Sequence, residues 1–446
     1  MHWIWYRGLG IAVGGAIALW ASYAFAQITP DNSLPENSRV FTQRNVRIIE
    51  DGTRAGDNLF HSFSEFSVPN GSTAYFNNAL NIQNIISRVT GSSVSNIDGL
   101  IRANGTANLF MINPNGIIFG RNASLNIGGS FLASTASSLK FADNTLFSAS
   151  PFTTNTSLLI ISVPIGLQYG SNPGGIQLQG SNLQVNPGKS LALLGGNVSI
   201  DSGKIMAGGG RVELGGLAGV GTVGLNIDSA GNLLSLSFPS EVQRSNVALV
   251  NGTQVNVTAS GGGSIAVNAR NIDILGRSRV DAGISKNSGS VDTTAGNITV
   301  DATETVTLRQ SSLIANQINS GATGISGTID LFADSLNILS GSQLFTTTSG
   351  QGNASDVNIN VRNQISVDGE NPGIGTSGVI TTVGETGVGK GGDINISTGS
   401  LAVTNGAQLN ALTSNKGDAG NVNINATDTA FFDGAGSNYN ASGILA

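Results

Sequence analysis

The sequence predicts an all-β fold of the β-helix type, a solenoid in which the short strands of one coil pair with those of the next. Composition is the first observation: of 446 residues 62 are Gly, only 11% are charged and only 6% are aromatic. This balance suits many short strands joined by turns better than a series of ordinary globular domains. No segment of helical length carries an apolar stripe with the 3.6-residue period.

A repeat that starts at residue 296 is the second observation. Five segments share a pattern in which the third and fifth positions are aliphatic and the position between them is polar: GNITV from Gly296, GTIDL from Gly327, SDVNI from Ser355, GDINI from Gly392 and GNVNI from Gly420. Alternation of period two, kept in register over five repeats, predicts strands with one face stacked inward and one face outward.

Each repeat is expected to contain two more strands. The second is marked by aliphatic pairs such as Val306 and Leu308, and in the last repeat by Phe431. The third is marked by one aliphatic residue in each of four repeats: Leu313, Leu344, Val379 and Leu409. An insertion around Asp368–Gly373 lengthens one repeat, and Asp368–Gly378 is a candidate binding loop. Ser442-Gly443-Ile444 predicts the opening of one more third strand. Such an ending is expected of a fragment, a truncated gene or a rod that ends on a partner.

The N-terminus predicts a secretory signal peptide, residues 1–26. Arg7 precedes the apolar run Gly8–Leu19, and Ala24-Phe25-Ala26 places small residues where signal peptidase cleaves. Cleavage after Ala26 would leave Gln27 as the first residue of the mature chain. The apolar run is shorter than the ~18–20 residues that span a bilayer, so we expect no transmembrane span in the mature chain.

Charge and residue counts exclude several functions. The formal charge is −6 and no basic stripe is present, so the sequence has no electrostatic footprint for nucleic acid. It has no Cys, and His61 is the one His outside the signal peptide, so we expect no metal site, no cofactor and no catalytic residue. Gly219–Gly224 matches GxGxxG, but no helical stripe follows it, which argues against a dinucleotide site.

A turn motif, Asn113-Pro114-Asn115-Gly116, separates two strand-like runs, Asn108–Ile112 and Ile117–Phe119. Pro presets φ for the second turn position, Asn tolerates the bridge or left-handed region, and Gly takes the position that a Cβ would crowd. Within a β-helix we expect this turn to be a corner of a coil, with the two runs bonded to neighbouring coils rather than to each other.

Two upstream segments also have strand character. Val40–Ile49 alternates Arg with aliphatic residues, which is typical of an exposed or edge strand. Asn58–Val68 is one of the few aromatic concentrations, and its spacing places either Phe60 or Phe63, together with Phe66 and Val68, near an inner face.

The N-terminal half resembles the secretion domain of the filamentous haemagglutinin type of two-partner secretion exoproteins. An ordered series of stretches carries the resemblance: Pro30-Asp31-Asn32-Ser33-Leu34, Asn58-Leu59-Phe60-His61-Ser62-Phe63, Ile82-Gln83-Asn84-Ile85-Ile86-Ser87-Arg88-Val89-Thr90-Gly91, Ala107-Asn108-Leu109-Phe110, Asn113-Pro114-Asn115-Gly116-Ile117, Ile127-Gly128-Gly129-Ser130-Phe131 and Ala133-Ser134-Thr135-Ala136. Asn78-Ala79-Leu80 departs from the family, whose members often have Asn-Pro there.

The resemblance implies a right-handed parallel β-helix with capping and extra-helical strands in the secretion domain. It divides the chain into a signal peptide at 1–26, a secretion domain at 27–260 and a β-helix repeat region at 261–446. It implies recognition during export by the POTRA-type periplasmic domains of a dedicated outer-membrane transporter. The secretion motif carried over is Asn113, Pro114, Asn115, Gly116 and Ile117, and the further secretion-domain residues are Asn58, Leu59, Phe60, His61, Phe63, Asn78 and Leu80.

We therefore predict an adhesin-like protein that passes through the periplasm and is secreted or held at the cell surface. Its ligand on host or neighbouring cells is unknown, with a glycan as one candidate. Two alternatives stay open, a secreted carbohydrate-active β-helix enzyme and the stem of a contact-dependent toxin. The enzyme is disfavoured because acidic residues are scattered, and only Asp356 and Asp393 share a position in the repeats.

Overall fold

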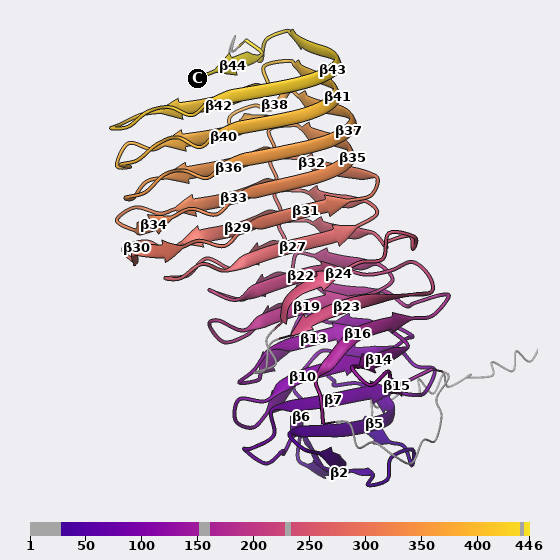
Figure 1. Cartoon of the computed structure of the whole chain (residues 1–446). Helices are drawn as coiled ribbons and strands as arrows, with labels where there is room; N and C mark the ends of the chain where they lie inside the picture. The colour runs from indigo at the N-terminus through magenta and orange to yellow at the C-terminus, as the bar shows by residue number, and fades with distance from the viewer. Residues whose placement is uncertain (1–27, 151–160, 228–232, 438–440) are drawn as a thin grey trace, which may run out of the picture.

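The computed structural model describes residues 28–150, 161–227, 233–437 and 441–446. Over these residues every regular element is a β-strand, and the strands of successive coils stack along one axis from the N-terminal to the C-terminal end (Figure 1). The predicted all-β, parallel β-helix architecture is confirmed. The predicted signal peptide and its cleavage site at Ala26 and Gln27 lie outside the described residues.

Two faces of the coils belong to one large sheet, which is parallel except where β1 and β4 pair with β5. Its strands are β1 Ile28–Pro30, β4 Thr53–Ala55, β5 Asn58–Phe66, β7 Asn84–Val89, β8 Ser95–Ile97, β10 Asn108–Ile112, β11 Ile117–Phe119, β13 Phe131–Ser134, β17 Ile176–Gln179, β19 Ser190–Leu194, β20 Val198–Asp201, β22 Arg211–Gly215, β25 Val247–Val250, β27 Ser264–Ala269, β28 Ile272–Leu275, β31 Ile298–Ala302, β32 Thr305–Arg309, β35 Ile329–Leu339, β37 Val357–Asp368, β41 Ile394–Thr404 and β43 Val422–Asp433.

The third face is made by two sheets in sequence. Near the N-terminus these strands are β2 Ser38–Gln43, β3 Val46–Asp51, β6 Thr73–Phe76, β9 Leu100–Ala103 and β12 Ser124–Asn126. They are followed by β18 Asn182–Gln184, β21 Lys204–Met206, β26 Gln254–Asn256, β29 Arg279–Ile284, β33 Leu313–Ile318, β36 Gln343–Thr348, β40 Gly378–Val383, β42 Gln408–Thr413 and β44 Gly443–Leu445. The segment Val40–Ile49, which we predicted as one exposed or edge strand, is instead a hairpin of β2 and β3, and only β2 forms the edge of the sheet.

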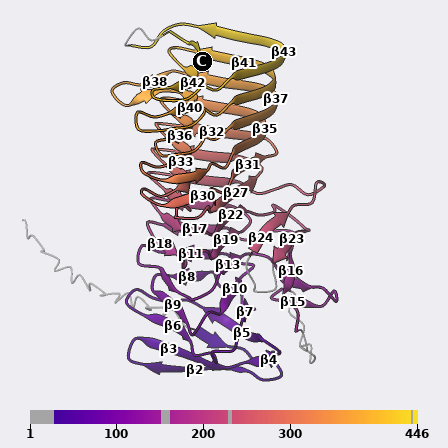
Figure 2. The same cartoon turned by 60° about the vertical axis from the view of Figure 1, so that its left-hand side comes forward.

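An antiparallel sheet outside the coils covers part of the N-terminal half (Figure 2). Its strands are β14 Ser138–Phe141, β15 Leu146–Ser148, β16 Pro164–Tyr169, β23 Gly221–Ile227 and β24 Leu233–Ser237. Two small pairings complete the described strands: β30 Gly289–Thr294 with β34 Thr323–Ile325, and β38 Glu370–Asn371 with β39 Gly375–Thr376. The GxGxxG match falls on the start of β23, a strand that pairs with β16 and β24, so this segment lacks the helix of a dinucleotide site.

The repeat predicted from residue 296 is confirmed in register. Ile298, Ile329, Val357, Ile394 and Val422 lie opposite one another in successive coils. The insertion is the β38–β39 hairpin, and Ile444 stacks on Leu409 as the matching third strand predicts.

Two positions in the repeat were predicted one residue out of place. The inward residue of β33 is Ile314, which pairs with Leu344, whereas Leu313 pairs with Gln343. In β43, Phe432 lies opposite Val403, and Phe431 is 52% exposed. In both cases two apolar residues are adjacent, so the alternating pattern fits whichever of them faces inward. Only the pairing with the next coil determines which one does.

The described residues form two large hydrophobic cores and one small cluster, which consists of Ile284, Ala295, Ile318 and Ala322. The first fills the interior of the coils continuously from Ile28 to Ala411. The second lies between the outward face of the early coils and the antiparallel sheet, where Phe60 packs with Phe147 and Phe141 at ring centroid distances of 5.1 and 6.1 Å. Among the described residues no helix is long and apolar enough to cross a membrane.

One outward position, repeated in twelve coils, defines what we call the outer column. Its members are Phe60, Ile86, Phe110, Leu132, Ala192, Glu213, Ala266, Thr299, Asp330, Asn358, Asn395 and Asn423. The first five are apolar and belong to the second core. The last four are polar, and three of them are asparagines.

Candidate secretion site

The predicted secretion motif, Asn113–Ile117, forms a corner of a coil, and this position in the fold agrees with the prediction. β10 ends at Ile112 and pairs with β7 and β13, whereas β11 begins at Ile117 and pairs with β8 and β17. The turn closes by a hydrogen bond from Gly116 N–H to Asn113 O of 3.1 Å. Gly116 has φ +126°, and a Cβ there would lie 3.1 Å from Gly175 O, so both conformation and space favour glycine.

Asn113 is fully buried, and its amide is engaged on both sides. Nδ2 donates to Ser93 O at 3.0 Å and to Ser95 Oγ at 2.9 Å, on the preceding coil. Oδ1 accepts the main-chain N–H and the Nδ2–H of Asn115, each at 3.0 Å. The side chain therefore fixes the corner from inside, and a ligand cannot reach it.

Asn115 is the exposed residue of the motif, and Pro114 is half-buried. Asn115 Nδ2 donates to Gly91 O at 2.7 Å, and Pro114 O accepts the N–H of Gly174 at 2.8 Å. Ile117 points into the first core and is fully buried. Of the five motif residues, Pro114 and Asn115 are thus the pair that a partner protein can contact.

Asn58 begins a ladder of buried asparagines. Asn84 Nδ2 donates to Asn58 Oδ1 and Asn108 Nδ2 donates to Asn84 Oδ1, both at 2.9 Å. Asn108 Oδ1 then accepts the N–H of Ser130 at 2.7 Å. The ladder links the predicted residue Asn58 to the strand that leads into the corner. We did not single out Asn84 or Asn108 from the sequence, although both precede aliphatic residues as Asn58 does.

The other motif residues on β5 divide between the two cores. Leu59 and Phe63 face the interior of the coils, whereas Phe60 faces the second core. Of the two residues predicted as alternatives for the inner face, Phe63 is therefore the one that lies there. His61 is buried between the rings of Phe63 and Phe76, and its Nδ1 lies 2.9 Å from Ser38 Oγ. Burial lowers the pKa of His61 to about 3, so the imidazole is neutral at pH 7.

Asn78 and Leu80 lie in the corner between β6 and β7, whereas the predicted secretion motif lies in the corner between β10 and β11. Asn78 is buried, its Oδ1 accepts Asn104 N–H at 2.9 Å, and its Nδ2 donates to Asn104 O at 3.3 Å. Leu80 is 77% exposed. Asn78 therefore joins two consecutive corners without the proline usual in the family, while Leu80 is available at the surface.

A buried ionic network ties the N-terminal strand to the coils. Arg88 donates from Nε to Ser62 Oγ at 2.8 Å, from Nη2 to Ser33 Oγ at 2.9 Å and from Nη1 to Ser148 O at 2.6 Å. Burial lowers the pKa of Arg88 to about 10, and the charge of Asp31 opposes this shift. The guanidinium thus links the loop after β1, two coils and the antiparallel sheet, a role that the sequence alone did not suggest.

Asp31 is the anionic end of this network. Its Oδ2 accepts Ser62 Oγ–H at 2.8 Å and Thr90 Oγ1–H at 2.5 Å. Burial acts to raise the pKa of Asp31, but hydrogen bonds from Ser33, Thr90 and Ser62 outweigh it, so the pKa lies below its usual value.

Comparison with known protein families shows the class to which this protein belongs. A model of the TPS secretion domain family matches residues 26–267, more than half of the chain. The chain belongs to the TPS secretion domain family, and it is an exoprotein of two-partner secretion. It is exported through the periplasm and across the outer membrane by a transporter partner, and it is secreted or held at the cell surface.

Among the proteins similar to this chain are two from Haemophilus influenzae. The crystal structure of the HMW1 secretion domain from Haemophilus influenzae matches with a TM-score of 0.54, covering 92% of this chain and 97% of that one. Its sequence identity is 20%, so this likeness concerns the fold. The heme/hemopexin-binding protein of Haemophilus influenzae strain Rd is 31% identical over 120 residues, which span 25% of this chain and 12% of that protein.

Proposed function

We propose that this exoprotein is an adhesin in two parts: a secretion domain at 27–260 that addresses the chain to its transporter, and a repeat region at 261–446 that displays a binding surface. The outer column carries this proposal. Its early members are apolar and lie under the antiparallel sheet, which ends at Ser237, whereas its members from Asp330 onward are polar and partly or fully exposed. The covered apolar surface fits a compact secretion domain, and the uncovered polar surface fits a repeat region that binds a ligand.

Within the secretion domain, we propose that Pro114 and Asn115 form the contact with the POTRA-type periplasmic domains of the transporter, and that Asn113, Gly116 and Ile117 hold them in place. The exposure of Asn115 beside the buried Asn113 supports this division of roles. Asn58, Leu59, Phe60, His61, Phe63 and Asn78 would then support the fold of the domain, and the exposed Leu80 would be a further contact.

A secretion assay tests these roles. Deleting the transporter should leave the chain inside the cell, and appearance in the medium at the normal level would contradict the central proposal. With the transporter present, Asn115→Ala should lower secretion severalfold while the purified protein keeps its stability. Asn122→Ala is the matched control, because Asn122 is an exposed asparagine at the next corner, where it hydrogen-bonds Asp98.

The N-terminal processing is a separate part of the proposal. We propose that residues 1–26 are removed, so that the mature chain starts at Gln27. Mass spectrometry of the secreted protein should give this N-terminus. A mature protein that retains Met1–Ala26 would contradict it.

We propose no catalytic role for the acidic residues of the repeats. Asp356 Oδ1 accepts the N–H of Asp393 at 2.8 Å, and Asp393 Oδ1 accepts the N–H of Asn421 at 2.7 Å. These carboxylates stack the corners, whereas a glycosidase needs one carboxyl group that donates a proton. Among the described residues no group of three or more His, Cys, Asp or Glu side chains is arranged to hold a metal ion.

A further inference from the structure

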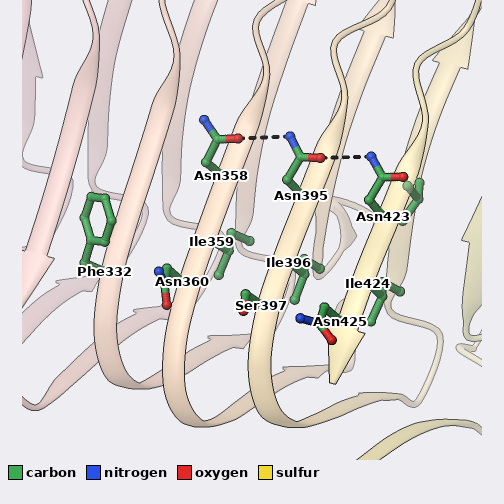
Figure 3. A pocket seen from close by; sticks show the side chains of 11 residues that line it. Phe332, Asn358, Ile359, Asn360, Asn395, Ile396, Ser397, Asn423, Ile424 and Asn425 are labelled. Atoms are coloured by element: carbon green, nitrogen blue, oxygen red, sulfur yellow. Dashed lines mark hydrogen bonds between the residues drawn. The ribbon is translucent and has the colours of Figure 1, made fainter. Parts of the chain in front are cut away.

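A groove of about 590 Å³ runs over the outward face of β37, β41 and β43 (Figure 3). One row of side chains along it is Asn358, Asn395 and Asn423, the last members of the outer column. A second row, two residues further along each strand, starts with Phe332 and continues through Asn360 and Ser397. The groove thus crosses several coils along the axis of the solenoid.

The first row is an ordered ladder of amides. Asn358 Nδ2 donates to Asp330 Oδ1 at 2.8 Å, Asn395 Nδ2 to Asn358 Oδ1 at 3.0 Å, and Asn423 Nδ2 to Asn395 Oδ1 at 2.9 Å. Each of these bonds uses one N–H and one oxygen lone pair, so every amide keeps a second donor and a second acceptor for a ligand. Because the ladder fixes the amide planes, these groups recur at the coil spacing of about 4.8 Å.

Phe332 adds an apolar platform at one end of the groove. Its side chain is 42% exposed, although it stands on a well-paired strand between Asp301 and Asn360 of the neighbouring coils. An exposed aromatic ring beside polar amides combines a flat apolar face with hydrogen-bonding groups.

Charge restricts what the groove can accept. Of the described residues that line it, none is charged. Its surroundings are mainly acidic. Asp330 stands at the start of the ladder, and Arg362 is paired with Asp334. At the adjacent corners three carboxylates, Asp356, Asp393 and Asp418, outnumber the one cation of that pocket, Lys390. Nucleic acid and sulfated or carboxylated glycans are therefore disfavoured.

The floor of the groove also excludes a peptide strand. β37 pairs with β35 and β41, and β41 pairs with β37 and β43, so the main-chain groups beneath Asn358 and Asn395 are already used, whereas β43 pairs on one side within the described residues. A peptide cannot add to this face as an extra strand. What remains is a ligand with its own donors and acceptors along an extended chain.

We propose that this groove binds a neutral, extended polysaccharide, whose hydroxyl groups bond to the amide ladder and whose sugar ring stacks on Phe332. A pyranose ring in an extended β-linked chain is about as long as one coil is high, ~4.8 Å, so successive sugars meet successive asparagines. This inference rests on the proposed adhesive function and gives it a ligand class and a site.

The test uses the purified mature chain and measures binding by calorimetry and saturation-transfer NMR. The probes are linear oligosaccharides of β-linked glucose, mannose, galactose or xylose, two to six sugars long, with heparin and polygalacturonate as acidic comparators. Binding to at least one neutral series, with affinity that rises with length, is expected. Absence of neutral binding, or a preference for the acidic glycans, overturns the proposal.

Variants locate the site. Phe332→Ala and Asn395→Ala should each weaken binding at least tenfold, and Phe332→Ala does so without touching the ladder. Asn363→Ala is the control, because Asn363 is an exposed asparagine on β37 outside the groove. If the control weakens binding as much as the two groove variants, the groove is not the site. If cells displaying the chain adhere to their targets while no neutral glycan binds, this inference fails and the adhesive function stands. If they do not adhere, the proposed function itself fails.

Discussion

Replacing Asn113 by alanine should destabilise the secretion domain strongly, even though the residue lies in a surface corner. The change removes four hydrogen bonds, two of which reach Ser93 and Ser95 on the preceding coil. Each such bond contributes about 1 kcal/mol net, and a buried acceptor that loses its donor costs ~1–3 kcal/mol. We therefore expect a loss of about 3–4 kcal/mol for Asn113→Ala. For Asn115→Ala we expect less than ~1 kcal/mol, since that amide is exposed and water can replace it.

Urea unfolding followed by far-ultraviolet circular dichroism measures the two losses. All three Trp residues lie in the first 26 positions, so a mature chain offers no Trp fluorescence. In a solenoid the coils need not unfold together, so hydrogen exchange of peptides from β7, β10 and β11 should locate the effect. Exchange should accelerate there in Asn113→Ala and stay unchanged in β37 and β41. Equal effects of the two variants, or a loss below ~1 kcal/mol for Asn113→Ala, would refute the argument from buried hydrogen bonds.

Three further perturbations probe the packing. Burial raises the pKa of Glu213 from 4.5 to about 7, against the effect of the adjacent Arg211, so the folded state holds the extra proton. Stability should therefore fall by at most about 3 kcal/mol as pH rises from the unfolded to the folded pKa, and Glu213→Gln should flatten this part of a thermal-unfolding profile. A Cβ on Gly129 would lie 2.6 Å from the backbone of the preceding coil, so Gly129→Ala should lower the melting temperature by several degrees. Gly261 has open space around it, so Gly261→Ala should leave the melting temperature unchanged. Equal shifts in the two variants would contradict this argument. Arg88→Lys should cost about 2–3 kcal/mol and speed proteolysis near the N-terminus, because Lys cannot make the forked contacts; unchanged proteolysis would argue against the network.

The sequence contained the parts of the fold that depend on local pattern. The alternation in the repeats predicts strands and their register, and the residue types at Asn113–Gly116 predict a corner. Local sequence does not determine which of two adjacent apolar residues points into the core. For this reason the sequence predicted Leu313 at the position of Ile314, and Phe431 at the position of Phe432.

Contacts between coils were harder to predict in the secretion domain because its coils differ in length. The asparagine ladder spans 26 residues from Asn58 to Asn84 and 24 from Asn84 to Asn108. One coil later, Ser130 and Ser190 meet across 60 residues, because the chain leaves the solenoid to build strands of the antiparallel sheet. With no constant period, sequence spacing could not align these positions.

The closure of the solenoid at its N-terminal end bears on the order in which the coils fold. At the N-terminal end, antiparallel strands β1, β2 and β4 close the sheets, and the Asp31–Arg88 network holds the adjoining loop against the coils. A coil that follows therefore finds a finished template on its N-terminal side only, which favours folding in the order of the sequence. The outer column shows the same order. Coils near the closed end need the antiparallel sheet to cover Phe60 and Phe110, whereas later coils carry partly or fully exposed asparagines and need no such cover. Coils of the second kind need only the preceding coil as a template and no strand from outside the solenoid.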